Sequence, residues 1–472
     1  MSFVILGHCC KDGSCLQVCP QNCIYPAPGE PDFATVEHLY IDPAACIDCA
    51  ACVDACPAQA IKPGTALTDT EQVYAEHSGM YFDLLATSRS PRTGRPSIPT
   101  ALGASSMRIA IVGAGSAAMY TVRELLQRSS SVQITVFEQS TQPGGLLRTA
   151  VSPDQRGIRE MTRLFDVPFA DPRVQIRFDV RVGVEVTMEF LRSRYDAVVL
   201  AHGATRPRKI AAPATADVHQ AIDVLARAHA AHADGNGPIR LLAGPTAVIV
   251  GGGNVALDVA TSIAKRRILT RAGAPISRVV VVARTPPSRP AFTFSALHEL
   301  SQHDVDFAVD TSGTRIGGAA ADPIVRLLAA CVRDGGASSH SAPLSVEVIF
   351  GREVTALTTA DGGIRLDTEK VAAGGRVRLT TAAANALTAD SVIMAAGFTC
   401  EPMPGVPVGA DGAVHHREGR VVSPVSGEVI EGLYVVGWAK RGGRGGVGEN
   451  RRCAAQTVDM IVADKGHLTG HE

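Results

Sequence analysis

Two runs of cysteines near the amino terminus constrain the fold of this chain more than any other feature. The second run, "CIDCAACVDACP", has the spacing CxxCxxCxxxCP, and nine of the twelve cysteines lie within the first 56 residues. A disulfide framework is one alternative, but nothing in the sequence indicates secretion, and disulfides are rare in the cytosol. Zinc would require two well-separated CxxC pairs. The continuous spacing therefore favours iron–sulfur clusters.

The first run, "CCKDGSCLQVCP", repeats this spacing but carries Asp12 in place of the second cysteine. Over residues 1–62 the chain resembles the dicluster bacterial ferredoxins, in which the fourth cysteine of each run ligates the other cluster. The resemblance implies a [4Fe–4S] cluster held by Cys19, Cys46, Cys49 and Cys52. It implies another cluster held by Cys9, Cys15 and Cys56.

Asp12 occupies the position of the fourth ligand of that other cluster. A carboxylate is a harder and weaker ligand for iron than a thiolate. We therefore expect either a [3Fe–4S] cluster or a labile [4Fe–4S] cluster with Asp12 as a ligand. Cys10 is an alternative fourth ligand, although its place next to Cys9 would strain that arrangement.

Length and charge limit the remaining choices. A chain of 472 residues exceeds a single compact core, so two to four domains are expected. The net charge of −1 gives no global bias toward nucleic acid or membranes. The longest apolar stretches are shorter than the roughly 20 residues that span a bilayer. Charge and the short apolar stretches thus lead us to expect neither a nucleic-acid partner nor a membrane span. Because no signal peptide is evident, we expect a cytoplasmic protein.

A first nucleotide-binding motif begins at residue 107, "MRIAIVGAGSAAMYTVRELLQRSSSVQITVFEQS". An apolar strand leads into Gly113, Gly115 and Ala118, a helical pattern follows, and a second strand ends at Glu138. The glycines allow a tight turn and close approach of a pyrophosphate at the helix amino terminus, and the acid accepts hydrogen bonds from ribose hydroxyls. This pattern predicts a Rossmann-type dinucleotide site.

A second motif begins at residue 247, "AVIVGGGNVALDVA". Gly251, Gly253 and Ala256 repeat the turn, but here the second strand ends in Arg284. A cation at that position suits the 2′-phosphate of NADP, whereas the acid of the first motif suits FAD. The two motifs therefore predict two different dinucleotides.

The fold class expected is an α+β ferredoxin domain followed by two α/β Rossmann-like domains, the NADP domain being inserted into the FAD domain. The strand "DSVIMAAGF" is expected to lead the chain back into the FAD domain. The predicted boundaries are 1–62 for the ferredoxin domain, 63–106 for a helix and linker, 107–207 and 390–472 for the FAD domain, and 208–389 for the NADP domain.

Residues 107–472 resemble the adrenodoxin-reductase type of ferredoxin–NADP reductase, through motifs such as "PGGLLRTAVSPD", "VVLAHGAT" and "GWAKRGGRGGVGEN". The full chain resembles actinobacterial fusions of a seven-iron ferredoxin with such a reductase. The resemblance implies FAD contacts at Ala117, Glu138, Gly145, Leu146, Val182, Trp438, Gly445, Gly446 and Val447. It implies NADP contacts at Gly251, Gly252, Gly253, Asn254, Arg284 and Gly445.

Three positions depart from the family pattern. Thr285 replaces the second of two arginines, which weakens the expected grip on the 2′-phosphate, and Ala296 replaces a glutamate. Gln155 replaces a histidine that is thought to assist proton handling near the flavin together with the residue at Asp258. Gln155 does not titrate, so it can only donate or accept hydrogen bonds.

The predicted function is that of a ferredoxin–NADP reductase. NADPH exchanges a hydride with FAD, and single electrons pass to or from iron–sulfur clusters. The expected partners are NADPH and either a ferredoxin or a downstream acceptor such as a cytochrome P450. An alternative is an accessory electron-transfer subunit of a larger complex, similar to the small subunit of glutamate synthase.

Overall fold

The structure is a computed structural model that describes residues 2–85, 106–149, 161–208, 210, 217–311, 323–330, 343–360, 362–372, 375–376 and 386–466. These residues divide into two compact units. The first comprises Met1–Arg206 with Phe398–Glu472, and the second comprises Pro207–Gly397. The predicted linker sequence "SRSPRTGRPSIPT" lies outside the described residues.

The amino-terminal part of the first unit is built from two small antiparallel strand pairs and two short helices that carry the cysteine runs. β1 pairs with β4, and β2 pairs with β3. The elements are β1 (Phe3–Ile5), α1 (Ser14–Val18), β2 (Ile24–Tyr25), η1 (Pro31–Ala34), β3 (Tyr40–Ile41), α2 (Ala51–Ala55), β4 (Ile61–Pro63) and η2 (Gly64–Ala66).

Helix α3 (Gln72–Leu85) packs back onto this part. The ring of Tyr81 stacks on that of Tyr40 with centroids 4.2 Å apart, and its hydroxyl donates a hydrogen bond to Asp32. Aromatic side chains thus attach the helix to the core of this amino-terminal part.

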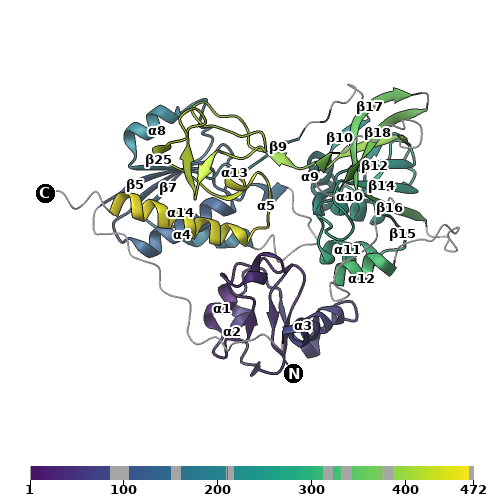
Figure 1. Cartoon of the computed structure of the whole chain (residues 1–472), viewed down its shortest axis with the longest axis horizontal. Coiled ribbons are helices and arrows are strands. Elements are labelled where there is room, and N and C mark those ends of the chain that lie inside the picture. Colours follow the sequence, from purple (N-terminus) through teal and green to yellow (C-terminus); the bar gives the residue numbers. More distant parts are fainter. Residues whose placement is uncertain are drawn as a thin grey trace. The chain divides into compact units, whose positions relative to one another are not determined.

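The rest of the first unit is a sheet with the order β23-β24-β25-β8-β5-β6-β7, whose strands from β25 to β7 are parallel. Helices α4 and α14 lie together along one face of it (Figure 1), and both contribute to its apolar core. The strands are β5 (Arg108–Val112), β6 (Gln133–Phe137), β7 (Val174–Arg177), β8 (Ala197–Leu200), β23 (His416–Arg417), β24 (Arg420–Val422) and β25 (Val429–Val435). The helices are α4 (Ser116–Arg128), α5 (Leu146–Thr149), η3 (Met161–Phe165), α7 (Asp166–Phe169), α8 (Met188–Arg194), α13 (Gly437–Arg441) and α14 (Glu449–Gly466). A short pair, β9 (Arg206–Pro207) with β22 (Phe398–Thr399), lies where the chain leaves and re-enters the first unit.

The second unit contains a parallel sheet with the order β10-β21-β12-β14-β16-β15. Its strands are β10 (Val218–Gln220), β12 (Thr246–Val250), β14 (Arg278–Ala283), β15 (Val305–Asp310), β16 (Leu344–Phe350) and β21 (Ser391–Met394). Its helices are α9 (Ala221–Ala233), α10 (Asn254–Ala264), α11 (Phe294–Ser301) and α12 (Pro323–Ala330). Smaller strands are β11 (Ile239–Leu242), β13 (Ile268–Thr270), β17 (Arg352–Ala360), β18 (Gly363–Ala372), β19 (Gly375–Arg376) and β20 (Ala386–Ala389).

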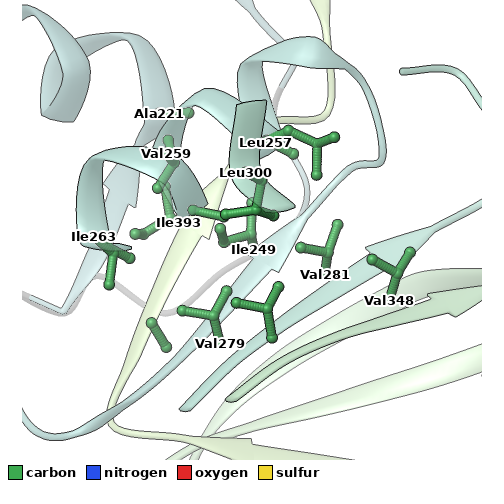
Figure 2. Packing of buried hydrophobic residues seen from close by; sticks show 14 of the residues in the cluster. Ala221, Ile249, Leu257, Val259, Ile263, Val279, Val281, Leu300, Val348 and Ile393 are labelled. Carbon is green, nitrogen blue, oxygen red and sulfur yellow. The ribbon is translucent and has the colours of Figure 1, made fainter. Parts of the chain in front are cut away.

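Continuous runs of apolar residues, which place apolar side chains on both faces, explain why this sheet forms. Figure 2 shows Ile249 and Val281 of neighbouring strands beside Leu257 of α10, all of them fully buried. Such β-branched strands flanked by helices are typical of a buried parallel sheet.

One expectation from the sequence needs correction. The strand expected to lead back into the FAD domain, β21, instead pairs with β12 inside the second unit, where Ile249 lies opposite Ile393. The return to the first unit therefore falls at Phe398 rather than at residue 390. After Ser391 the strand is apolar, and its sequence does not indicate which of two similar sheets it joins.

Candidate functional site

The four cysteines predicted for the [4Fe–4S] cluster line one pocket. Cys46, Cys49 and Cys52 come from the loop and first turn that lead into α2, and Cys19 follows the end of α1. Burial raises the pKa of the Cys52 thiol to about 11, so binding of iron has to displace the thiol proton. Cys23 lies beside this set, with its sulfur 3.4 Å from that of Cys19.

The three cysteines predicted for the other cluster also lie together. Cys9, Cys15 and Cys56 interact electrostatically with one another and with Asp12. Burial raises the pKa of the Cys9 thiol to about 11. Backbone amides point at two of the sulfurs: Lys11 N lies 3.4 Å from Cys9 Sγ, and Ala60 N lies 3.3 Å from Cys56 Sγ. Such hydrogen bonds tune the reduction potential of an iron–sulfur cluster.

Asp12 does not extend an uncommitted carboxylate toward these cysteines. Its Oδ1 accepts a hydrogen bond from Ser14 N at 3.0 Å, and its Oδ2 accepts one from Ser14 Oγ at 2.5 Å. Arg451 of α14 also donates to Oδ2, at 3.5 Å. The thiol of Cys10 interacts electrostatically with Asp12, Cys9 and Cys56, so Cys10 also lies close to this site.

Each cysteine set offers several thiols, as an iron–sulfur cluster requires. Across the residues that the structure describes, no three His, Cys, Asp or Glu side chains gather as the ligands of one metal ion would. A cubane cluster needs a wider arrangement, because each thiolate binds a different iron. The pocket and the two sets of thiols fit such clusters.

The first glycine turn connects β5 to α4. Gly113 has φ +97°, and a Cβ on it would lie 2.8 Å from Ala201 O, so only glycine fits. Gly115 caps α4, and the space where its Cβ would point is open. Glu138 follows β6, is buried, and accepts hydrogen bonds from Ala114 N at 2.7 Å and Ser140 N at 2.8 Å. The acid thus holds the turn closed from the end of the next strand.

Other predicted FAD residues lie around this turn. A Cβ on Gly145 would be 3.5 Å from the Cα of Gly115, so these two backbones approach closely. Leu146 begins α5, and Ala117 and Ala118 lie buried in the first turn of α4. Val182 is buried with the residues that end β5 and β6.

The glycine-rich segment before α14 supplies the remaining predicted FAD residues. Trp438 donates from Nε1 to Gly445 O at 2.7 Å and stacks against Phe398. Gly446 has open space at its Cβ position, and Val447 packs against the core. The tryptophan therefore fixes the loop whose amides are predicted to meet the flavin.

The second glycine turn connects β12 to α10. A Cβ on Gly251 would lie 2.1 Å from Ala395 O, and one on Gly252 would lie 2.4 Å from the Cβ of Ala283. Gly253 caps α10 and has open space. Asn254 does not leave its side-chain oxygen free, because Oδ1 accepts a hydrogen bond from Thr293 N at 2.8 Å. It joins the turn to the residues that begin α11.

The residues after β14 suit an anionic ligand. The Arg284 side chain is 70% exposed and forms a 3.5 Å ion pair with Glu353. The Thr285 hydroxyl is buried and has no hydrogen-bond partner among the described residues. An accessible guanidinium beside an unsatisfied hydroxyl fits a phosphate group.

The structure describes one of the two residues predicted to handle protons, Asp258, but not the other. Gln155 lies outside the described residues. Asp258 lies on α10, half-buried, and burial raises its pKa to about 7, helped by repulsion from Glu299. Lys265, which forms a 2.8 Å ion pair with Glu299, opposes this shift.

Sequence reasoning missed His202, which directly follows the first residue beyond β8. Both of its ring nitrogens are buried without a partner among the described residues, and burial lowers its pKa to about 4. A Cβ added to Gly113 would lie 2.9 Å from the Cα of His202, so the backbone of His202 lies against the glycine turn. Unsatisfied nitrogens at the edge of the glycine turn fit a bound FAD. A polar residue directly after a predicted central strand was the available signal.

Known proteins with a related sequence decide the family. The 4Fe-4S dicluster domain family matches residues 8–60, and the pyridine nucleotide-disulphide oxidoreductase family matches residues 107–332. The probable ferredoxin/ferredoxin–NADP reductase of Mycobacterium tuberculosis is 34% identical over 99% of this chain and 85% of its own length. That of Mycobacterium leprae is 32% identical over 98% and 86%. The chain belongs to the ferredoxin/ferredoxin–NADP reductase family.

Members of this family match the present chain in fold as well. The solved structure of Mycobacterium tuberculosis FprA in complex with NADPH superposes with a TM-score of 0.63, at 27% identity, over 77% of this chain and 85% of that one. The chain is a flavin-dependent ferredoxin–NADP reductase with an N-terminal iron–sulfur electron-transfer domain, as predicted. Within its described residues, no helix is both long and apolar enough to cross a membrane.

Proposed function

We propose that this reductase transfers electrons between NADPH and its own two iron–sulfur clusters, and through them to an external ferredoxin or an acceptor such as a cytochrome P450. The observation that carries the proposal is that one chain holds two sets of neighbouring cysteines and two glycine turns. The strand after the first turn ends at an acid, Glu138, and the strand after the second ends at a cation, Arg284. When bound, FAD accepts electrons in pairs from NADPH and releases them singly to iron–sulfur clusters.

The residues of the first unit hold FAD in this proposal. The turn containing Gly113 and Gly115 offers helix amides to the pyrophosphate, and Glu138 accepts from the ribose. The loop fixed by Trp438, with Gly446 and Val447, directs its amides at the flavin. Gly145, Leu146, Ala117, Ala118, Gly445 and Val182 complete the contacts.

The residues of the second unit hold NADPH. Gly251, Gly252 and Gly253 form the pyrophosphate turn, with Asn254 at its edge. Arg284 leaves its weak pairing with Glu353 to bind the 2′-phosphate, and the Thr285 hydroxyl donates to the same group. Asp258 is suited to hold a proton near neutral pH, because its raised pKa lies there. Gln155 does not titrate, so its part in the proposal is limited to hydrogen bonding or the positioning of water.

The cluster held by Cys9, Cys15 and Cys56 is a [3Fe–4S] cluster in this proposal. Support comes from the hydrogen bonds that already engage both oxygens of the Asp12 carboxylate. A carboxylate so engaged is a poor fourth ligand for iron. An Asp12-ligated [4Fe–4S] cluster, or one ligated by Cys10, is the alternative outcome.

An anaerobic EPR spectrum with iron and sulfide counts tests this assignment. We expect seven irons per chain, three plus four, and the signal of an oxidised [3Fe–4S] cluster. Eight irons without that signal would show that the first site holds a complete cubane. Mixing with NADPH should then reduce the flavin and afterwards the clusters.

The accessory-subunit alternative predicts a different kinetic result, namely little turnover of NADPH with an added one-electron acceptor until a partner subunit is supplied. A cytoplasmic location also belongs to the proposal, because the cluster thiolates need a reducing compartment. So does the division of the chain into a ferredoxin domain, a helix and linker, and a FAD domain interrupted by the NADP domain, with the return to the FAD domain placed at Phe398.

A further inference from the structure

The first cluster site lies directly against the FAD-binding part of the same unit. Cys9, Cys10 and Cys56 pack onto a small apolar cluster that includes Met161, and Val447 packs onto the same cluster. Val447 belongs to the loop proposed to meet the flavin. One layer of side chains thus connects the cysteines of the first site with that loop.

The backbone fit at this contact is close. A Cβ on Gly448 would lie 1.5 Å from the carbonyl oxygen of Cys10, so the contact tolerates no side chain there. Backbone atoms of the two parts approach as they do inside a protein core, where shape complementarity excludes water.

Charged groups fasten the same contact. Arg451 of α14 donates to Asp12 O at 2.8 Å and to Ser14 Oγ at 3.1 Å, in addition to its bond with the Asp12 carboxylate. The side chains of Arg451 and Asp12 are only 16% and 4% exposed. The Arg452 guanidinium lies over the ring of Phe33, 5.8 Å from its centroid. A buried, hydrogen-bonded ion pair is strongly coupled, because removing one partner leaves the other charge buried and unpaired.

The second cluster site has a different surrounding. Cys49 is exposed, and Ile47, which lines the same pocket, is 56% exposed. Val18, next to the ligand Cys19, is 41% exposed. The rim of this site therefore presents apolar side chains and a ligand to solvent.

We infer that the cluster beside Asp12 is the inner cluster, which exchanges electrons with FAD, and that the four-cysteine cluster is the outer one, which serves external redox proteins. Arg451 is the positioning residue that holds the inner cluster against the FAD loop. The inference rests on the proposed function. The electron transfer balances, because one NADPH yields NADP⁺, a proton and two electrons, and the two clusters take one electron each.

The test uses the full-length holoprotein, with Arg451→Glu as the disrupting variant and Arg192→Glu as the control. Arg192 is an exposed arginine of α8 whose side chain, among the described residues, donates to the backbone carbonyl of Glu431. Its substitution makes the same change in charge without touching the contact beside Asp12. Arg451→Lys tests rescue, since it restores a cation. Equal iron, sulfide and FAD contents establish that each variant is intact.

Two readouts are compared. In hydrogen exchange, Arg451→Glu should expose the amides of residues 9–16, whereas Arg192→Glu should not. In anaerobic rapid mixing with NADPH, flavin reduction should keep its rate, but loss of the oxidised EPR signal of the inner cluster and reduction of the outer cluster should both slow by about 10-fold or more. Arg451→Lys should recover part of each effect.

Three results would overturn the inference: unchanged hydrogen exchange in Arg451→Glu, unchanged reduction of the inner cluster, or an outer cluster that is reduced at the wild-type rate while the inner one is slow. Failure of NADPH to reduce the flavin at all would instead count against the proposed function. Hydrogen exchange would then still report whether Arg451 fastens the contact.

Discussion

The two glycine turns of the reductase share one backbone design and differ in the residue that follows the second strand. Gly113 and Gly251 both have positive φ and no room for a side chain, and Gly115 and Gly253 both cap a helix beside open space. The strand-end residues differ in environment as well as in charge. Glu138 is buried and bonded to its own turn, whereas Arg284 is exposed and loosely paired.

This difference separates a permanent site from an exchangeable one. Because Glu138 is already bonded to the turn, the proposed FAD site is ordered before the cofactor binds, which lowers the entropy lost on binding. The proposed NADP ligand Arg284 is exposed and loosely paired, which suits a substrate that enters and leaves in every turnover. The equivalent positions in the following helices differ too: Tyr120 is completely buried, whereas Asp258 is a half-buried acid.

The largest effect is expected from adding one methyl group to the turns. In Gly251→Ala the new Cβ would overlap Ala395 O, at φ +123°, so we expect the second unit to lose about 3 kcal/mol or more of stability. In Gly115→Ala nothing is overlapped, so the apoprotein should stay within about 0.5 kcal/mol of wild type while FAD affinity falls. Thermal unfolding and FAD content measure both. Equal destabilisation by the two substitutions would contradict the comparison.

A smaller effect is expected from the strand-end cation. Arg284→Ala should raise KM for NADPH about 10-fold, because it removes one charge-assisted contact to the 2′-phosphate, and should leave kcat unchanged. KM for NADH, which lacks that phosphate, should not change. Arg278→Ala is the control, since this exposed arginine begins the same strand and pairs with Glu347. An equal loss with both coenzymes would argue against Arg284 as the 2′-phosphate ligand.

A comparable effect is expected in the pH dependence of stability at Asp258. Its pKa in the folded protein is about 7, above the ordinary value, so between about pH 4 and 7 the folded state holds a proton that the unfolded state has lost. The stability that this group contributes is therefore complete at low pH and declines as the pH rises through that window. Because the side chain is only half-buried, we expect a decline on the order of 1 to 2 kcal/mol.

Asp258→Asn should remove this decline. Urea unfolding at about pH 5 and about pH 8 should show the variant gaining stability relative to wild type at the higher pH. Tyr120→Phe offers a matched substitution in the other helix, since it removes a buried hydroxyl that has no hydrogen-bond partner in the described part of the chain, and it should show no such pH dependence. A constant difference between Asp258→Asn and wild type at both pH values would refute the raised pKa.

Local patterns predicted much of this molecule. The cysteine spacing predicted two ligand sets, and the structure brings the cysteines of each set together. The glycine turns were predicted from strand, turn and helix signals within short segments. These features depend on neighbours in sequence, so the sequence is sufficient to find them. The placement of β21 was wrong because its apolar residues suit either sheet equally well.

Contacts between distant segments were beyond such reasoning. The bond from Arg451 to Asp12 spans 439 positions, and nothing near either residue indicates the other. The same holds for Gly448, whose need for glycine arises from the carbonyl of Cys10 rather than from its own φ angle. The hydrogen bond from Thr293 N to the side-chain oxygen of Asn254, 39 positions away, could not be predicted either.

The short strands β9 and β22 have a consequence for how such enzymes are assembled. They pair where the chain leaves and re-enters the first unit, with Arg208 N donating to Gly397 O at 2.9 Å and Thr399 Oγ1 donating to Arg206 O at 3.3 Å. The two ends of the inserted segment therefore lie side by side. An inserted domain with adjacent ends can be acquired, exchanged or deleted as a cassette, because the host sheet loses no strand and its chain path stays the same. The coenzyme choice of the reductase can thus evolve separately from its flavin and its iron.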